Sequence, residues 1–267
     1  MKKTKSIIFF FILLLIIPSF LYGLEEKEKI ETDNFVILFR HEEKDYAENV
    51  LEWIEEAREK LNPIFDFSPK RRLYINIAHR LRGFAAPDAR AQYLPLNHTI
   101  QILSITTFKN NNANLLYLKG ILWHEYIHFI QHEILGIRFR NMPKWLMEGM
   151  ADYFGRGKSG FKIVPHLLWL EGGNFLAKHR IPTLKELNYM FKINPSSSTL
   201  YFFSYHICKF ITEKTNEATL IDMLYDLKKG DKIEKIIQNR LNLDILEMEK
   251  EFKRYLISHY KIVSKNE

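Results

Sequence analysis

Cysteine is almost absent from this 267-residue chain: Cys208 is the only one, so no disulfide can form within it. The sequence also has no internal repeat or low-complexity segment, which excludes a fibrous or disordered protein. Hydrophobic residues make up 46% of the chain and aromatic residues 14%, enough for a packed core in a single domain. That core must hold the fold, with a bound metal ion as the further option.

A strong excess of either charge is missing as well. The net charge is +7, but three lysines and no acid lie in the first 23 residues, so +4 remains for the rest. Acidic and basic side chains are interleaved, and so modest an excess favours a soluble protein that does not bind nucleic acid.

The first 23 residues have the layout of a secretory signal peptide. Three lysines precede an uninterrupted apolar run from Ile7 to Ile17, and Pro18 and the small Gly23 follow it. The run is short for a membrane span, which needs about 20 residues. A cleavage site of the A-x-A type is missing, so an uncleaved N-terminal membrane anchor is the alternative, and no lipid-anchor cysteine is present. Either way we expect export, to the periplasm or outside the cell, or anchoring to the membrane facing outward.

Strand patterns come first in the chain and helix patterns follow, which is the order typical of an α+β fold. We expect one small mixed sheet with a helix, followed by a mostly helical C-terminal half. The expected strands are residues 34–39, 71–78 and 98–104. The expected helices are residues 44–62, 115–134, 143–154, 184–192, 199–214, 217–228, 231–241 and 244–260.

The boundaries that follow are a leader at 1–23, an N-terminal α/β subdomain at 24–113 and a helical subdomain at 114–267. The polar segment 109–114 (KNNNAN) marks the change from strands to helices. We expect the two subdomains to form one catalytic domain.

The motif HExxH lies inside an apolar helical run, as His124, Glu125 and His128. Residues four apart lie on one face of a helix, about 6 Å apart along its axis, so both imidazoles can reach one zinc ion. Glu125 would lie beside the metal, where it can accept a proton from a bound water. The motif alone also occurs by chance, and a catalytic zinc needs a third protein ligand.

His132 continues the same i+4 row but is a poor third ligand. It lies eight residues from His124, about 12 Å along a straight helix, whereas zinc ligands lie about 2 Å from the ion. We therefore expect His132 to be a polar side chain beyond the site.

A better third ligand occurs twenty residues after His128, in MPKWLMEGMADYFG. Pro143 suits the start of a helix and Gly155 its end. Glu148 can face the first helix, and Asp152 lies one turn further on the same face. Asp152 could then accept the second ring proton of a ligand histidine, which fixes the tautomer and the orientation of that ring. The alternative is a surface helix with ordinary acids.

HEYIH followed by WLMEGMADYF resembles the gluzincin zinc metallopeptidases, specifically the bacterial peptidase-MA-like group. That group pairs HExxH with a downstream W-x-x-E-G-x-A motif whose glutamate is the third zinc ligand. The resemblance implies that His124, His128 and Glu148 hold Zn²⁺ and that Glu125 is the general base. It is strong at these two motifs and looser elsewhere from about residue 34 onward.

Two further expectations come from the resemblance. The tyrosine that stabilises the oxyanion in this family begins a helix in a pattern that Tyr201 fits, with Tyr205 and His206 as substitutes one turn away. The strand at 98–104 resembles the edge strand on which such enzymes bind the substrate backbone, and His98 would be an ordinary polar residue of that strand. The chain lacks the G-x-M-E-N segment that binds a free amino terminus in the aminopeptidases of the family.

The sequence therefore predicts a zinc-dependent peptidase that acts on a peptide or protein substrate. The first alternative is an envelope binding or assembly module with the same fold, for which the basic, aromatic segment 156–180 would be a docking surface. The intact Glu125 favours the enzyme, because degenerate members usually lose this base. A zinc hydrolase that does not act on peptides is a third option.

Overall fold

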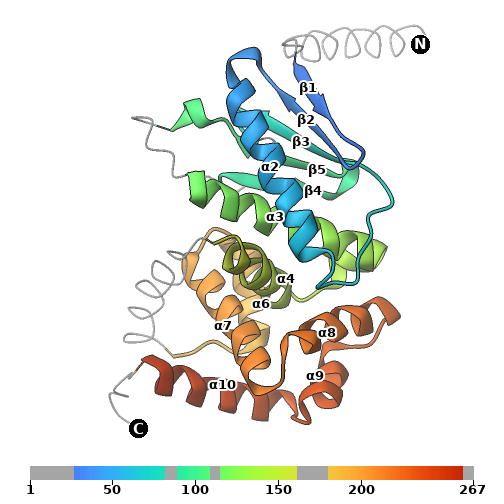
Figure 1. The fold of residues 1–267 in the computed structure, drawn as a ribbon. Helices are drawn as coiled ribbons and strands as arrows, with labels where there is room; N and C mark the ends of the chain where they lie inside the picture. The colour runs from blue at the N-terminus through green and yellow to red at the C-terminus, as the bar shows by residue number, and fades with distance from the viewer. Residues whose placement is uncertain (1–26, 82–88, 109–114, 161–179, 261–267) are drawn as a thin grey trace, which may run out of the picture.

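The protein is described by a computed structural model that covers residues 27–81, 89–108, 115–160 and 180–260. A mixed sheet with the strand order β1-β2-β3-β5-β4 lies at one end of the molecule, and a group of helices lies at the other (Figure 1). The strands are β1 (Glu28–Glu31), β2 (Phe35–Phe39), β3 (Leu73–Ala78), β4 (Ala91–Leu94) and β5 (Thr99–Leu103). β2, β3 and β5 are parallel neighbours, whereas the outer strands β1 and β4 run antiparallel to theirs.

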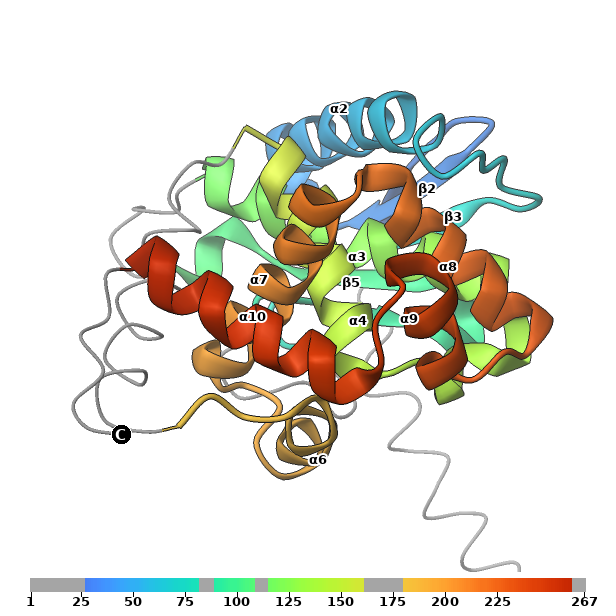
Figure 2. The same ribbon diagram turned by 90° about the horizontal axis from the view of Figure 1, so that it is seen from below.

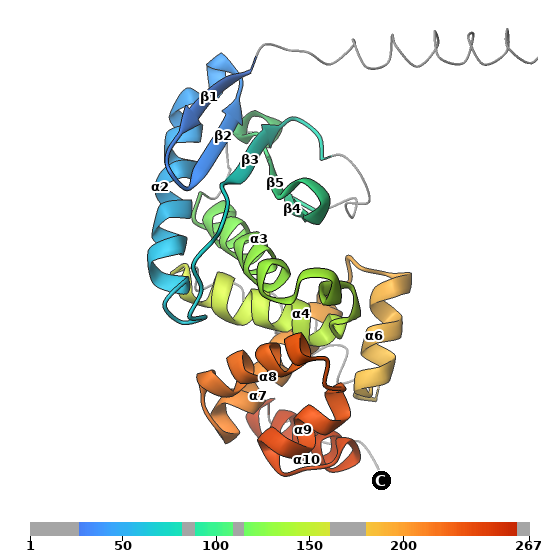
Figure 3. The same ribbon diagram turned by 90° about the vertical axis from the view of Figure 1, so that its right-hand side faces the viewer.

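Buried and more exposed residues alternate along β3 and β4, so one face of the sheet packs against the core and the other is more exposed. In β3, Leu73, Ile75 and Ile77 are buried, whereas Tyr74 between them is 43% exposed. Side chains in a strand alternate between the two faces, so one face of β3 contributes to the core. Helix α2 (Lys44–Leu61) and helix α3 (Leu115–Leu135) pack against the sheet, as Figures 1 and 3 show.

β5 does not form the edge of the sheet, contrary to the expectation for residues 98–104. It lies between β3 and β4, and β4 is the outermost strand on that side among the described residues. β4 is only four residues long and is followed directly by Pro95, so it carries a weak strand signal. His98 is likewise not a strand residue, because it has a φ of 49° in the turn before β5.

Helix α3 is buried on nearly all sides. It lies between the sheet and the C-terminal helices, as the side view in Figure 3 shows, and a helix with apolar residues all round is typical of such a position. Two of its large side chains hydrogen-bond to α2 and to the residue that follows it: Trp123 Nε1 donates to Trp53 O in the middle of α2 at 2.9 Å, and Tyr126 OH donates to Asn62 Oδ1 at 2.9 Å. The helix ends before Gly136, whose φ of 57° favours glycine, as the sequence predicted.

The segment after α3 forms a short α-helix that widens into a π-helical segment. Helix α4 spans Lys144–Met150 with Pro143 just before it, and the π-helical segment spans Ala151–Arg156. Gly155 therefore does not end this helix, contrary to its expected role. A Cβ atom at Gly155 would lie 2.7 Å from the Cα and N atoms of His124, so glycine here permits the close approach of α3.

The remaining helices complete the lower part of the molecule as drawn in Figure 1, and Figure 2 shows them from below. They are α6 (Leu184–Ile193), α7 (Ser198–Lys214), α8 (Glu217–Lys229), α9 (Ile233–Leu241) and α10 (Ile245–Tyr260). Their boundaries agree with the predicted ranges to within two residues, and the predicted α+β class is confirmed. Within the part of the chain that the structure describes, no helix is both long and apolar enough to cross a membrane. The leader at 1–23 lies outside the described residues.

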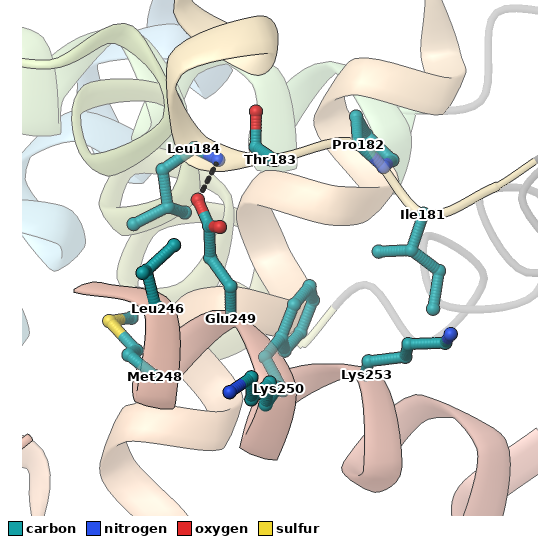
Figure 4. Close-up of a pocket in the computed structure, with 10 residues that line it drawn as sticks. Ile181, Pro182, Thr183, Leu184, Leu246, Met248, Glu249, Lys250 and Lys253 are labelled. Atoms are coloured by element: carbon teal, nitrogen blue, oxygen red, sulfur yellow. Dashed lines mark hydrogen bonds between the residues drawn. The ribbon is translucent and has the colours of Figure 1, made fainter. Parts of the chain in front are cut away.

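A hollow of about 250 Å³ lies where the start of α6 meets α10 (Figure 4). Its walls include Ile181, Leu246 and Met248, and its one carboxylate, Glu249, already accepts a hydrogen bond from the Leu184 N–H at 2.8 Å. The other lining residues that carry charge are Lys250 and Lys253, so this hollow brings together no histidine and no second carboxylate.

Candidate metal centre

Helices α3 and α4 bring three potential metal ligands together in the middle of the molecule. Glu148 Oε2 lies 3.3 Å from His124 Nε2 and 3.3 Å from His128 Nε2. The two Nε2 atoms lie 3.1 Å apart. His124 and His128 are only 3% and 8% exposed, so these polar atoms face one another within the core.

This triangle has the size that a tetrahedral zinc site requires. Zinc lies about 2.0–2.1 Å from imidazole nitrogens and carboxylate oxygens, so two ligands of a tetrahedron lie about 3.3–3.4 Å apart. The observed edges are 3.1 to 3.3 Å. Two imidazoles and one carboxylate are also the donor set of a catalytic zinc that keeps its fourth position open. The residues present therefore fit a zinc ion.

Negative charge gathers around these imidazoles, as expected for a site that holds a cation. Burial opposes the charged form of His124, but Asp152 and Glu148 outweigh it and raise the pKa of His124 to about 9. Burial likewise opposes ionisation of Glu148, yet His128 and His124 lower the pKa of its carboxyl well below the ordinary value.

Each of these two histidines is oriented through its Nδ1 atom. His124 Nδ1 lies 2.8 Å from Asp152 Oδ1 in the π-helical segment. His128 Nδ1 lies 3.0 Å from Gln131 Oε1, and Gln131 Nε2 in turn donates to Met147 O at 3.0 Å. With protons held at both Nδ1 atoms, the Nε2 atoms are the ones that would bind a metal ion, which would displace any proton from them.

Gln131 and Arg156 are site residues that the sequence interpretation missed. Gln131 lies three residues after His128 on the same helix, and this spacing was the available signal. Arg156 Nε lies 3.2 Å from Asp152 Oδ1, so the carboxylate that orients His124 is itself paired with a cation. The sequence alone does not show that one carboxylate oxygen of Asp152 contacts both the His124 ring and the Arg156 guanidinium.

Glu125, the expected base, points toward the sheet. Its side chain is buried, and Oε2 accepts a hydrogen bond from the backbone N–H of Tyr93 in β4 at 2.7 Å. Leu103 N donates to Arg90 O, so Arg90 points its backbone groups at the neighbouring strand. In an antiparallel pair every second residue does so, and Tyr93, three residues after Arg90, therefore points its N–H away from β5. Glu125 therefore links α3 to the outer strand β4.

Of the three candidates for the oxyanion group, Tyr201 lies beside a ligand histidine. Its ring centroid is 6.2 Å from that of His124. Burial and the nearby Glu148 carboxylate raise the pKa of Tyr201 well above its ordinary value, so its hydroxyl stays protonated. Tyr205 instead packs on Tyr153, with ring centroids 6.1 Å apart, and His206 packs on Phe202 at 4.4 Å.

His132 lies outside this centre, in a second group with His98 and Glu133. Burial lowers the pKa of both His98 and His132, so both rings are neutral at pH 7, the form that binds metals.

Comparison of the chain with models of known protein families gave no match, and comparison with curated proteins gave none either.

Proposed function

We propose that the protein is a zinc-dependent peptidase of the gluzincin type. The observation that carries this proposal is the triangle of His124 Nε2, His128 Nε2 and Glu148 Oε2, with edges of 3.1 to 3.3 Å, together with the buried Glu125 that follows His124 in α3. These residues come from the two motifs on which the resemblance to the peptidase-MA-like group rests. His124, His128 and Glu148 would hold the zinc ion. When bound, zinc lowers the pKa of a water toward neutrality and polarises a carbonyl group.

Glu125 would move the protons of the reaction. Its carboxylate would accept a proton from the attacking water and then pass that proton to the leaving amine. The Tyr93 N–H holds the carboxylate at 2.7 Å, which fixes the direction in which the base points. A fixed base needs little rearrangement at the moment of proton transfer.

Tyr201 would donate a hydrogen bond to the oxyanion that forms on the scissile carbonyl. A donor for this task must keep its proton, and the raised pKa of the Tyr201 hydroxyl ensures that it does. The position of its ring beside His124 supports this role.

The outer strand β4 would bind the substrate backbone. The N–H and C=O of Ala91 and the C=O of Tyr93 point away from β5, so an extended peptide could add to this edge next to Glu125, which already accepts the Tyr93 N–H. This assignment moves the expected substrate strand from residues 98–104 to Ala91–Leu94.

The alternative of a binding or assembly module depended on segment 156–180, of which residues 161–179 lie outside the described residues. The buried Glu125 beside the metal ligands favours the enzyme, because a module that only binds has no need of this base. A location outside the cytoplasm stays a prediction from residues 1–23.

The test is to purify the full chain and its Glu125→Gln variant, and to measure zinc content and cleavage of a peptide library. We expect one zinc ion in this centre in both proteins and cleavage by the wild type alone. A wild type that leaves His124, His128 and Glu148 without zinc would disprove the centre. Equal cleavage by the pure Glu125→Gln variant would disprove the role of the base.

A further inference from the structure

A second set of potential metal ligands lies at the end of α3, one helical turn beyond the first. His132 and Glu133 come from α3, and His98 comes from the turn that joins β4 to β5. One potential ligand atom from each of the three lies within 4.8 Å of the others. Within this group, His98 Nδ1 lies 3.3 Å from Glu133 Oε1.

The chemistry of this group matches a transition metal ion rather than calcium or magnesium. Two imidazoles and one carboxylate suit zinc and similar ions, whereas calcium and magnesium prefer oxygen ligands alone. The side chains of His98 and Glu133 are 16% and 8% exposed, so the ligands are largely shielded but still reachable from solvent. A largely shielded carboxylate beside two imidazoles is a favourable place for a divalent cation.

The guanidinium of Arg71 contacts two of these three potential ligands. Its Nη1 atom lies 2.9 Å from His98 Nε2, and its Nε atom lies 3.5 Å from Glu133 Oε1. The guanidinium therefore balances the charge of Glu133 and would repel a second cation. The Arg71 side chain is 57% exposed, so it can turn into solvent, and a bound cation would then balance the charge of Glu133 in its place.

Tyr93 connects the group to the candidate active site. Its hydroxyl lies 2.9 Å from His132 Nδ1 and 3.3 Å from His98 Nδ1. Its backbone N–H is the donor that holds Glu125. One residue of β4 thus contacts both the second group and the expected base.

We propose that His98, His132 and Glu133 form a second, exchangeable Zn²⁺ site, which fills when Arg71 turns away and which fastens the β4–β5 turn to the end of α3. The three ligand atoms lie no more than 4.8 Å from one another. A tetrahedral ion needs ligand atoms about 3.3 Å apart, so any pair of them must approach by at most about 1.5 Å. This adjustment, together with the displacement of Arg71, makes binding weaker here than at the first centre. The proposal rests on this donor set alone and does not require the protein to cleave peptides.

The experiment counts zinc ions per chain by equilibrium dialysis of the metal-free, full-length protein. We expect Glu133→Gln and His98→Ala to bind one ion fewer than the wild type. Arg71→Ala should bind that ion about tenfold more tightly, because one unit of opposing charge is removed. Excess Mg²⁺ or Ca²⁺ should not displace it.

His41→Ala is the matched control, because His41 pairs with Glu28 at 2.6 Å but is 85% exposed and, among the described residues, belongs to no group of three potential ligands. It should bind as much zinc as the wild type. Unchanged zinc content in both Glu133→Gln and His98→Ala would overturn the proposal. If circular dichroism shows that these two variants are unfolded, Arg71→Ala decides, since unchanged or weaker binding in this exposed variant would also overturn it. The difference between wild type and variant does not depend on whether the first centre holds zinc or whether peptides are cleaved, so the two proposals fail separately.

Discussion

Asp152 Oδ1 lies 2.8 Å from His124 Nδ1, on the side of the ring opposite to the metal-facing Nε2 atom. Both groups are buried, and Arg156 Nε lies 3.2 Å from the same carboxylate oxygen. The contact holds a proton on Nδ1, so a metal ion that displaces the other ring proton would meet the Nε2 lone pair, and the carboxylate fixes the angle of the ring. Asp152 and His124 therefore act as one unit, although 28 residues separate them.

Asp152→Asn tests this unit. The amide cannot enforce the Nδ1–H tautomer as a carboxylate does, so we expect zinc affinity to fall by about 10- to 100-fold with the fold retained. Competition with a chromophoric chelator measures the affinity. The exposed Asp45→Asn, at the start of α2, is the control and should bind zinc as the wild type does. Wild-type affinity in Asp152→Asn would contradict the orienting role.

Gly155 should not tolerate even one methyl group. An added Cβ would lie 2.7 Å from the backbone of His124, and neither backbone can shift easily in this tightly packed region. We expect Gly155→Ala to lower the free energy of unfolding by about 1–3 kcal/mol, the range typical of overpacking, and to weaken zinc binding as well. Urea unfolding of the metal-free and zinc-loaded proteins measures both effects.

Gly157→Ala is the matched control two residues later. Its added Cβ would meet its nearest neighbour at 3.6 Å, an ordinary contact, and Gly157 has the helical angles φ −60° and ψ −35°. Alanine is about 0.5–1 kcal/mol better than glycine in such a conformation. Equal destabilisation of both variants would show that the contact with His124 is not the cause.

His206 should make the protein sensitive to mild acid. Burial lowers its pKa from 6.5 to about 3, so the folded protein resists protonation of this ring, whereas the unfolded chain takes up the proton near pH 6.5. The stabilisation is therefore complete above about pH 6.5 and is lost as the pH falls toward 3. Urea unfolding at pH 7.5 and pH 5 should show a smaller pH-dependent loss in His206→Leu than in the wild type.

Helical periodicity explains how much of the centre could be predicted from the sequence. The spacing of His124 and His128 fixes their common face on any helix, and the apolar residues around them indicate that this helix is buried. The exclusion of His132 used the same geometry, and the structure places that residue in the other group. Local rules of this kind hold because they do not depend on how distant segments pack.

The features that the sequence did not predict depend on tertiary packing. β4 is too short for its pattern to indicate a strand, and it is ordered by pairing with β5 and by its contact with α3. The hydrogen bond from the Tyr93 backbone to Glu125 involves an N–H group, which leaves no trace in the residue type. Gly155 suggested a helix end because glycine often has that role, whereas here its lack of a side chain permits contact between two helices.

Tyr201→Phe gives the sharpest test of the proposed reaction. Removal of the hydroxyl takes away a donor to the oxyanion, and the loss of one such donor typically costs about 10²–10³-fold in kcat. The ring stays, so its packing against His124 and against Phe191, at 5.6 Å between centroids, should be kept. Zinc content and the free energy of unfolding should therefore match the wild type. Because the hydroxyl would act only on the transition state, kcat and kcat/KM should fall by the same factor, whereas an effect on KM alone would indicate substrate binding.

Tyr205→Phe is the matched control for Tyr201→Phe. Tyr205 lies one helical turn after Tyr201 but packs on Tyr153, so this variant should keep nearly all activity. If Tyr205→Phe loses activity and Tyr201→Phe does not, the oxyanion donor is Tyr205 and the assignment made here is wrong.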